Sequence, residues 1–131
     1  MKKCGIMHRE LSAVIAGMGH GDKLMVCGSA FPIPPGAIRI ELALEPGLPA
    51  FMDVVRIICK ELLVECIIIA EETREASPHR FEELVSYFEG INIQVVPQSS
   101  LKEHAITAKA CVRTGECIPF SNVVLVSGVI F

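Results

Sequence analysis

The chain has 131 residues, of which 51% are hydrophobic, and its net charge is −3. This length fits one domain over residues 1–131 with a sizeable buried core. Basic residues do not cluster beyond Lys2–Lys3, so we expect no nucleic-acid partner, because a phosphate backbone is bound by many cations together. No uncharged apolar run approaches the roughly 18 residues of a membrane span, and the start does not resemble a signal peptide. We expect a cytoplasmic protein without a membrane partner.

The mean hydropathy of +0.50 is high for a small protein without a membrane span. A strand-rich core together with surface buried between subunits would account for it, so we expect a homo-oligomer. Among the six cysteines, Cys27, Cys66 and Cys111 lie in apolar strand-like runs, where cysteine behaves as a small hydrophobe. No CxxC or CxxH pair suggests a metal site, so we expect reduced thiols and no metal.

Helical and strand patterns alternate along the chain. In chain order we expect a helix over 11–18, a strand over 23–27, a proline-rich loop over 28–36, a strand over 38–44, a helix over 51–63, a strand over 65–70, a helix over 78–88, a strand over 91–96, a helix over about 100–108, a strand over 109–113, a loop over 114–121 and a strand over 122–126. Ser99 or Ser100 is a candidate cap for the last helix. The alternation predicts a three-layer α/β/α sandwich around a mostly parallel, mixed sheet.

Sites in such sheets lie at strand ends and helix termini. Histidine is the residue type suited to acid/base chemistry near neutral pH, so His20 in the GHGD turn over 19–22 is a candidate acid/base residue, and Asp22 is placed to orient its ring or hold its proton. The alternative is an exposed loop histidine without a role. Glu71–Glu72 follow an expected strand, where they either reach the same rim or are simply solvated. Phe120 and Asn122 offer an aromatic face and an amide, which suit a polyhydroxylated ring.

Motifs for nucleotide cofactors are missing from the sequence: there is no GxxxxGK[ST] loop and no GxGxxG turn. There is also no GxSxG elbow for a nucleophilic serine. The residues alone therefore predict acid/base chemistry on a small polar ligand, without naming that ligand.

Seven stretches, in matching order and spacing over nearly the whole chain, resemble the D-ribose pyranase family, which is similar to the fucose mutarotases. They are Met1–Met7, Gly19–Lys23 (GHGDK), Phe31–Pro34 (FPIP), Pro46–Phe51 (PGLPAF), Ala70–Glu72 (AEE), Ala110–Glu116 (ACVRTGE) and Pro119–Phe131. The resemblance implies a decamer of two pentameric rings, sugar sites between neighbouring subunits, and no metal or organic cofactor. It also implies interconversion of the β-pyranose and β-furanose forms of ribose.

Carried over by position, the resemblance makes His20 the proton donor. Lys102 and Asn122 match sugar-binding positions directly, and Ser121 also falls on one. Phe120 stands where a tyrosine is usual, which keeps the stacking face but loses a hydroxyl contact.

Two positions depart from the family pattern. Gly28 replaces an aspartate and has no side chain to accept a hydrogen bond, and Gln98 replaces the histidine of ribose-specific members but still donates and accepts. Ser29, Asp22 and His104 are candidates to compensate. We expect a pyranase or mutarotase acting on ribose or a related monosaccharide. The alternative is a sugar-binding or regulatory homologue whose catalysis is weakened or lost at these two positions.

Overall fold

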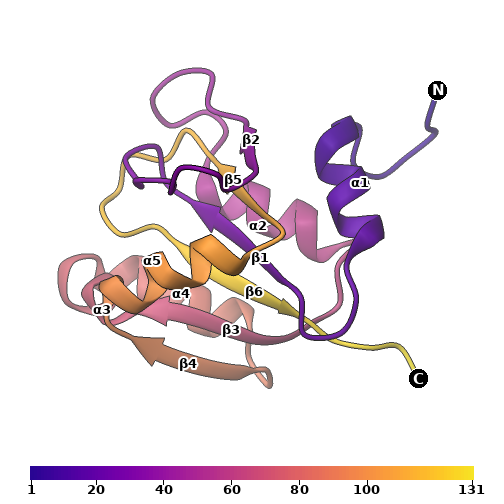
Figure 1. Ribbon diagram of the computed structural model, residues 1–131. Coiled ribbons are helices and arrows are strands. Elements are labelled where there is room, and N and C mark those ends of the chain that lie inside the picture. The colour runs from indigo at the N-terminus through magenta and orange to yellow at the C-terminus, as the bar shows by residue number, and fades with distance from the viewer.

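Six strands form one sheet in the order β2-β5-β1-β6-β3-β4 (Figure 1). The computed structural model describes all 131 residues. The strands are β1 (Lys23–Cys27), β2 (Arg39–Glu41), β3 (Val64–Ala70), β4 (Asn92–Val96), β5 (Ala110–Arg113) and β6 (Val123–Ser127). Their side chains alternate between the two faces: Leu24 and Val26 pack in one core cluster, and Met25 and Cys27 in the other.

Only β6 runs against its neighbours. It pairs antiparallel with both β1 and β3, whereas the pairs β1–β5, β2–β5 and β3–β4 are parallel. The sheet therefore has two different edges. The carboxyl edge holds the ends of five strands and the start of β6, and the amino edge holds the starts of five strands and the end of β6.

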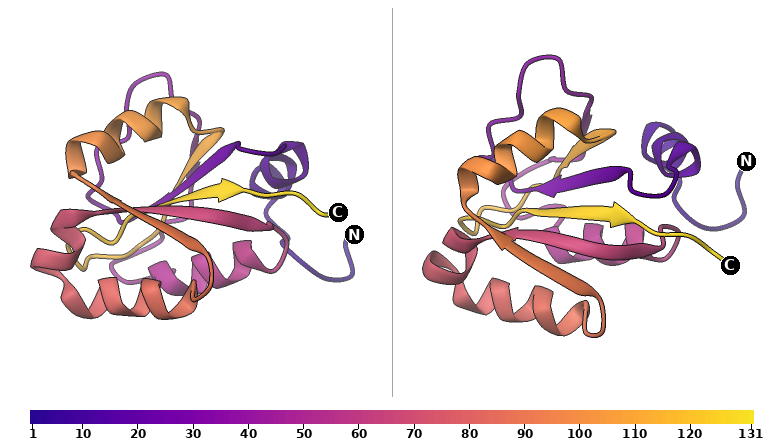
Figure 2. Two further views of the ribbon diagram at one scale, coloured as in Figure 1. Left: turned by 90° about the horizontal axis from the view of Figure 1, so that it is seen from below. Right: turned by 60° about the horizontal axis from the view of Figure 1, so that its bottom comes forward.

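Five helices cover both faces of this sheet: α1 (Arg9–Gly17), α2 (Phe51–Cys59), α3 (Glu71–Ala76), α4 (Pro78–Tyr87) and α5 (Gln98–Thr107). The larger core cluster buries apolar residues of α1, α2 and α4 against one face. The smaller cluster joins Leu101 and Ala105 of α5 and Phe31 of the proline-rich loop to the opposite face. Figure 2 shows α5 on one side of the sheet and α2 and α4 on the other. The predicted three-layer sandwich with a mostly parallel, mixed sheet is confirmed.

Most predicted elements occur within a few residues of their expected bounds, and the strand over 23–27 matches throughout. The strand expected over 38–44 is shorter, because its only neighbour, β5, ends at Arg113. The helix α3 was not expected. The prediction of a Ser99 or Ser100 cap is wrong: α5 begins at Gln98, whose N–H donates to Oε2 of Glu72 in α3 at 2.7 Å.

All six cysteines are free thiols. Cys27, Cys66 and Cys111 are buried as predicted, and burial raises the pKa of Cys27 to about 12. None of the helices combines the length and the hydrophobicity needed to cross a membrane.

Candidate functional site

A cavity of about 290 Å³ opens at the carboxyl edge of the sheet. We call it the carboxyl-edge pocket. Its wall includes every residue expected to bind substrate, namely Gly28, Gln98, Lys102, Phe120, Ser121 and Asn122. These residues come from the end of β1, from α5 and from the loop before β6. Strand order thus gathers positions that lie far apart in the sequence.

Gly28 and Asn122 are joined directly. Gly28 follows β1 and Asn122 precedes β6, which is the antiparallel neighbour of β1. The Gly28 N–H donates to Oδ1 of Asn122 at 3.1 Å. This bond uses the amide oxygen of Asn122, whereas its Nδ2 group has no hydrogen-bond partner within the chain and is available to a ligand.

Gln98 and Lys102 lie four residues apart in α5, which places them on one face of the helix. Lys102 is exposed, so its ammonium group is accessible. The Oε1 atom of Gln98 is buried and has no hydrogen-bond partner. An unpaired buried acceptor costs about 1–3 kcal/mol, and a hydroxyl donor in the pocket would remove that cost.

A buried ion pair supports the loop that forms one wall of the pocket. Nη2 of Arg80, in α4, lies 2.7 Å from Oε1 of Glu116, and the two side chains are only 8% and 10% exposed. Nε of Arg80 also donates to Oγ of Ser121 at 3.0 Å, so the Ser121 hydroxyl holds the loop. The pair was not predicted from the sequence. A signal was present, because Arg80 lies one helical turn before Leu84 and therefore on the buried face of α4.

Phe120 adopts a positive φ of 56°, which costs an L-residue free energy. Two hydroxyls hold the backbone there. Oγ1 of Thr73 donates to the Phe120 carbonyl at 2.8 Å, and Oγ of Ser77 donates to the Pro119 carbonyl at 2.7 Å. Thr73 belongs to the unexpected helix α3, so this element helps to fix the aromatic wall of the pocket.

His20 and Asp22 lie at the opposite edge of the sheet. They precede β1, whereas Gly28 follows it. A strand rises about 3.3 Å per residue, so the length of β1 alone separates the two locations by roughly 15 Å. One chain therefore brings the six pocket residues together but does not bring His20 to them.

Glu65 of β3, and not Asp22, contacts the His20 ring. Nε2 of His20 lies 2.9 Å from Oε1 and 3.0 Å from Oε2 of Glu65. The expectation that Asp22 orients the ring is wrong, because Asp22 Oδ2 accepts the Gly19 N–H at 2.9 Å and stabilises the turn instead. The sequence marks Glu65 as the single charged residue in the otherwise apolar run Val64–Ala70, but it does not indicate the partner of that residue.

None of the three candidates replaces a side chain at Gly28. Oγ of Ser29 donates to the Glu116 carbonyl at 2.8 Å, and Asp22 is at the other edge. Nδ1 of His104 lies 2.9 Å from Nζ of Lys23. Burial and then the Lys23 charge lower the pKa of His104, so it is placed as a neutral acceptor beside Lys23.

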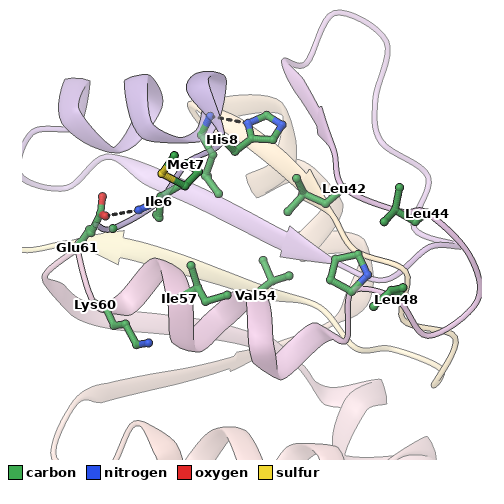
Figure 3. Close-up of a pocket in the computed structure, with 13 residues that line it drawn as sticks. Ile6, Met7, His8, Leu42, Leu44, Leu48, Val54, Ile57, Lys60 and Glu61 are labelled. Atoms are coloured by element: carbon green, nitrogen blue, oxygen red, sulfur yellow. Dashed lines mark hydrogen bonds between the residues drawn. The ribbon is translucent and has the colours of Figure 1, made fainter. Parts of the chain in front are cut away.

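A larger cavity of about 540 Å³ lies between α1, α2 and the loop after β2, away from the carboxyl-edge pocket (Figure 3). Polar groups at its margin serve the fold: Nδ1 of His8 accepts the Leu11 N–H and caps α1, and Glu61 accepts the Ile6 N–H. Its lining is otherwise mostly aliphatic, which does not suit a sugar. We call this cavity the apolar groove; its exposed large hydrophobic members are Met7, Leu44, Leu48 and Ile57.

Comparison with known proteins identifies relatives over the whole chain. The model of the RbsD / FucU transport protein family matches residues 1–130. The D-ribose pyranase of Symbiobacterium thermophilum is 47% identical and that of Lactobacillus gasseri is 44% identical, and each alignment covers 100% of both chains.

Solved structures agree with this assignment. Bacillus subtilis RbsD complexed with D-ribose superposes with a TM-score of 0.96 at 36% identity, over 100% of both chains. The fucose mutarotase of Streptococcus pneumoniae, complexed with L-fucose, shares the fold with a TM-score of 0.72 at 18% identity, over 95% of each chain. By its whole-length family match and these relatives, the chain belongs to the RbsD / FucU family.

Proposed function

We propose that this protein is a sugar isomerase that interconverts the pyranose and furanose forms of D-ribose or a related monosaccharide by acid/base-assisted ring opening. The observation that carries the proposal is the carboxyl-edge pocket, where all six expected sugar-binding residues line one small cavity. Relatives named D-ribose pyranase, and a structure of 36% identity complexed with D-ribose, support the same assignment.

The pocket offers the groups that a monosaccharide needs. A sugar hydroxyl both donates and accepts hydrogen bonds. Oε1 of Gln98 accepts such a donor, while Nδ2 of Asn122 and Nζ of Lys102 donate to hydroxyl oxygens. Phe120 supplies an apolar face for the C–H side of the ring. A small cavity in which polar groups converge beside aromatic residues, here Phe31 and Phe120, is typical of a site for a small polar ligand.

Ring opening requires two proton transfers. The anomeric hydroxyl loses its proton as C1 becomes a carbonyl, the bond between C1 and the ring oxygen breaks, and the ring oxygen takes up a proton. Closure through a different hydroxyl reverses these steps and gives the other ring size. His20 removes and returns the proton, and general acid/base catalysis of this kind contributes about 10²–10⁴-fold to a rate.

The site is shared between chains. Because His20 lies roughly 15 Å from the pocket along β1 of its own chain, a neighbouring copy supplies it, and the assembly is the decamer of two pentameric rings that the family resemblance implies. The apolar groove supports association: Leu44 is 81% exposed and Met7 is 57% exposed, and an exposed apolar patch of this kind is typical of an interface. A second copy covers it.

The reaction takes place in the cytoplasm. Six free thiols in 131 residues suit a reducing compartment, where thiols do not pair.

Saturation-transfer NMR tests the activity. The protein should accelerate exchange between ring forms for at least one sugar in a panel of ribose, fucose and common hexoses. His20→Ala should abolish the acceleration, while His79→Ala, which removes an exposed histidine at the start of α4, should leave it unchanged. Calorimetric sugar binding without acceleration of any exchange would show a binding protein in place of an isomerase.

A further inference from the structure

The pairing of His20 with Glu65 determines which ring nitrogen is free. An ionised carboxylate only accepts hydrogen bonds, and both of its oxygens lie within 3.0 Å of Nε2. Nε2 therefore carries the hydrogen. Nδ1 has no hydrogen-bond partner in the chain, so in the neutral ring it keeps its lone pair for a substrate.

Backbone bonds between the turn and the end of β6 hold this pair in place. The Gly21 N–H donates to the Ser127 carbonyl, and the Ser127 N–H donates to the Asp22 carbonyl, each at 2.8 Å. Glu65 lies on β3, the other neighbour of β6. His20 and Glu65 thus approach each other from two elements whose backbones are anchored to the same strand.

Gly128 leaves the space in which the Glu65 side chain lies. A Cβ atom at Gly128 would be 3.1 Å from Cβ and 3.5 Å from Oε2 of Glu65. The side chains of His20 and Glu65 nevertheless remain 59% and 44% exposed. The backbones that carry the pair are held by β6, and the pair is open on its outer side, where a neighbouring chain can present a sugar.

We propose that Glu65 is a positioning residue that fixes the tautomer of His20, so that Nδ1 exchanges protons with the sugar. This inference rests on the proposed function. Nδ1 takes the proton of the anomeric hydroxyl, the bond between C1 and the ring oxygen breaks, and Nδ1 returns the proton to the ring oxygen. The histidine ends neutral, and Glu65 stabilises the imidazolium that forms in between.

NMR of the protein with ¹⁵N-labelled histidine tests the tautomer directly, with the His20 signals assigned from a His20→Gln variant. At alkaline pH the wild type should show a protonated Nε2 and an unprotonated Nδ1. Glu65→Ala should mix the two tautomers, and Glu65→Gln should largely restore the wild-type pattern, because its amide oxygen still accepts from Nε2. Glu10→Gln, which removes an exposed carboxylate that pairs with Arg9, is the matched control.

Kinetics separate positioning from sugar binding. Glu65→Ala should lower kcat by about 10- to 100-fold, by analogy with the range seen when the partner that orients a metal-binding histidine is removed. KM should stay unchanged, because Glu65 is not part of the carboxyl-edge pocket. An unprotonated Nε2 in the wild type, a tautomer unaffected by Glu65→Ala, or an unchanged kcat would each overturn the proposal. If the wild type accelerates no exchange, the proposed function and the proton-transfer role of Nδ1 both fail, while the tautomer signals still decide whether Glu65 fixes the ring.

Discussion

The N–H of Gly28 donates to Oδ1 of Asn122 at 3.1 Å, across the facing ends of the antiparallel neighbours β1 and β6. This contact makes one side chain serve both the fold and the pocket. The hydrogen bond joins β1 to β6 at the carboxyl edge of the sheet, and it leaves the Nδ2 group of Asn122 available to the ligand.

Replacing Asn122 should therefore affect stability and sugar binding together. Asn122→Ala leaves the buried Gly28 N–H without an acceptor, which should lower the free energy of unfolding by about 1–3 kcal/mol. Urea denaturation measures this change, and calorimetry should show weaker sugar binding. Asn92→Ala, at an exposed position of β4, should change neither quantity; equal effects of the two substitutions would contradict the assigned role.

Gly28→Asp should strengthen sugar binding. The Gly28 φ is not positive, and a Cβ would lie 3.3 Å from the Glu116 carbonyl oxygen and 3.5 Å from that of Ser121, so a small local shift accommodates it. A carboxylate–hydroxyl bond of about 1.5–3 kcal/mol corresponds to roughly 10- to 150-fold in affinity. Calorimetry measures the gain, and Gly28→Ala separates the carboxylate from the added Cβ. Equal affinities of the Asp and Ala variants would contradict this expectation.

The buried Arg80–Glu116 pair should be costly to break from one side. Arg80→Met leaves the Glu116 carboxylate buried without its cation, and the free energy of unfolding should fall by about 3–5 kcal/mol. Arg74→Met removes the exposed partner of Glu71 and should cost less than about 1 kcal/mol. Both are measured by chemical denaturation. Adding Glu116→Gln to Arg80→Met should recover part of the loss, and failure to do so would rule out an unpaired charge as the cause.

A site shared between chains predicts complementation. His20→Ala and Asn122→Ala proteins should each be inactive or nearly so in the NMR exchange assay. Unfolding and refolding them together should restore activity, because some sites in a mixed assembly combine an intact histidine with an intact pocket. The control is a mixture of His20→Ala protein with wild-type protein that was refolded separately, so that the two are not refolded together. Activity that is not restored in verified mixed oligomers would show that both residues act from the same chain.

His104 should make the protein less stable at mildly acidic pH. Burial and the Lys23 charge lower the pKa of His104 below its usual value of 6.5, so the unfolded chain binds the proton more tightly than the folded chain. The stability contributed by the neutral ring is present above pH 6.5 and is lost as the pH falls below it. His104→Gln keeps an acceptor for Lys23 and should flatten the dependence of the midpoint of thermal unfolding on pH in this range. The same slope in the variant as in the wild type would assign the dependence to other groups.

Contacts between distant elements explain what the sequence could not predict. Gly28 and Asn122 flank strands, so chain order and the family resemblance place both at a strand end. Glu65 contacts a histidine 45 residues away, and that contact depends on the pairing of β3 with β6, which apolar runs do not specify. The apolar residues of a strand that is buried on both faces do not indicate the direction of the strand. The antiparallel orientation of β6 could therefore not be predicted either.

The short helix α3 was missed for a different reason. Its six residues, EETREA, contain one buried side chain, Thr73, and therefore lack the apolar spacing from which a helix is predicted. With α3 unrecognised, the contributions of Glu72 to the start of α5 and of Thr73 to the Phe120 backbone were also unpredictable. The residues that line the pocket could be predicted from the sequence, but the residues that hold them in place, such as Glu72 and Thr73, could not.

In the proposed site shared between chains, the length of β1 also makes turnover depend on protein concentration. In the proposed shared site, the pocket and His20 of one chain never meet, so a single chain contains no complete site. In the proposed assembly, each closed ring contains as many complete sites as it has chains. Specific activity should therefore fall on dilution past the point of dissociation while the circular dichroism spectrum of the folded chain persists.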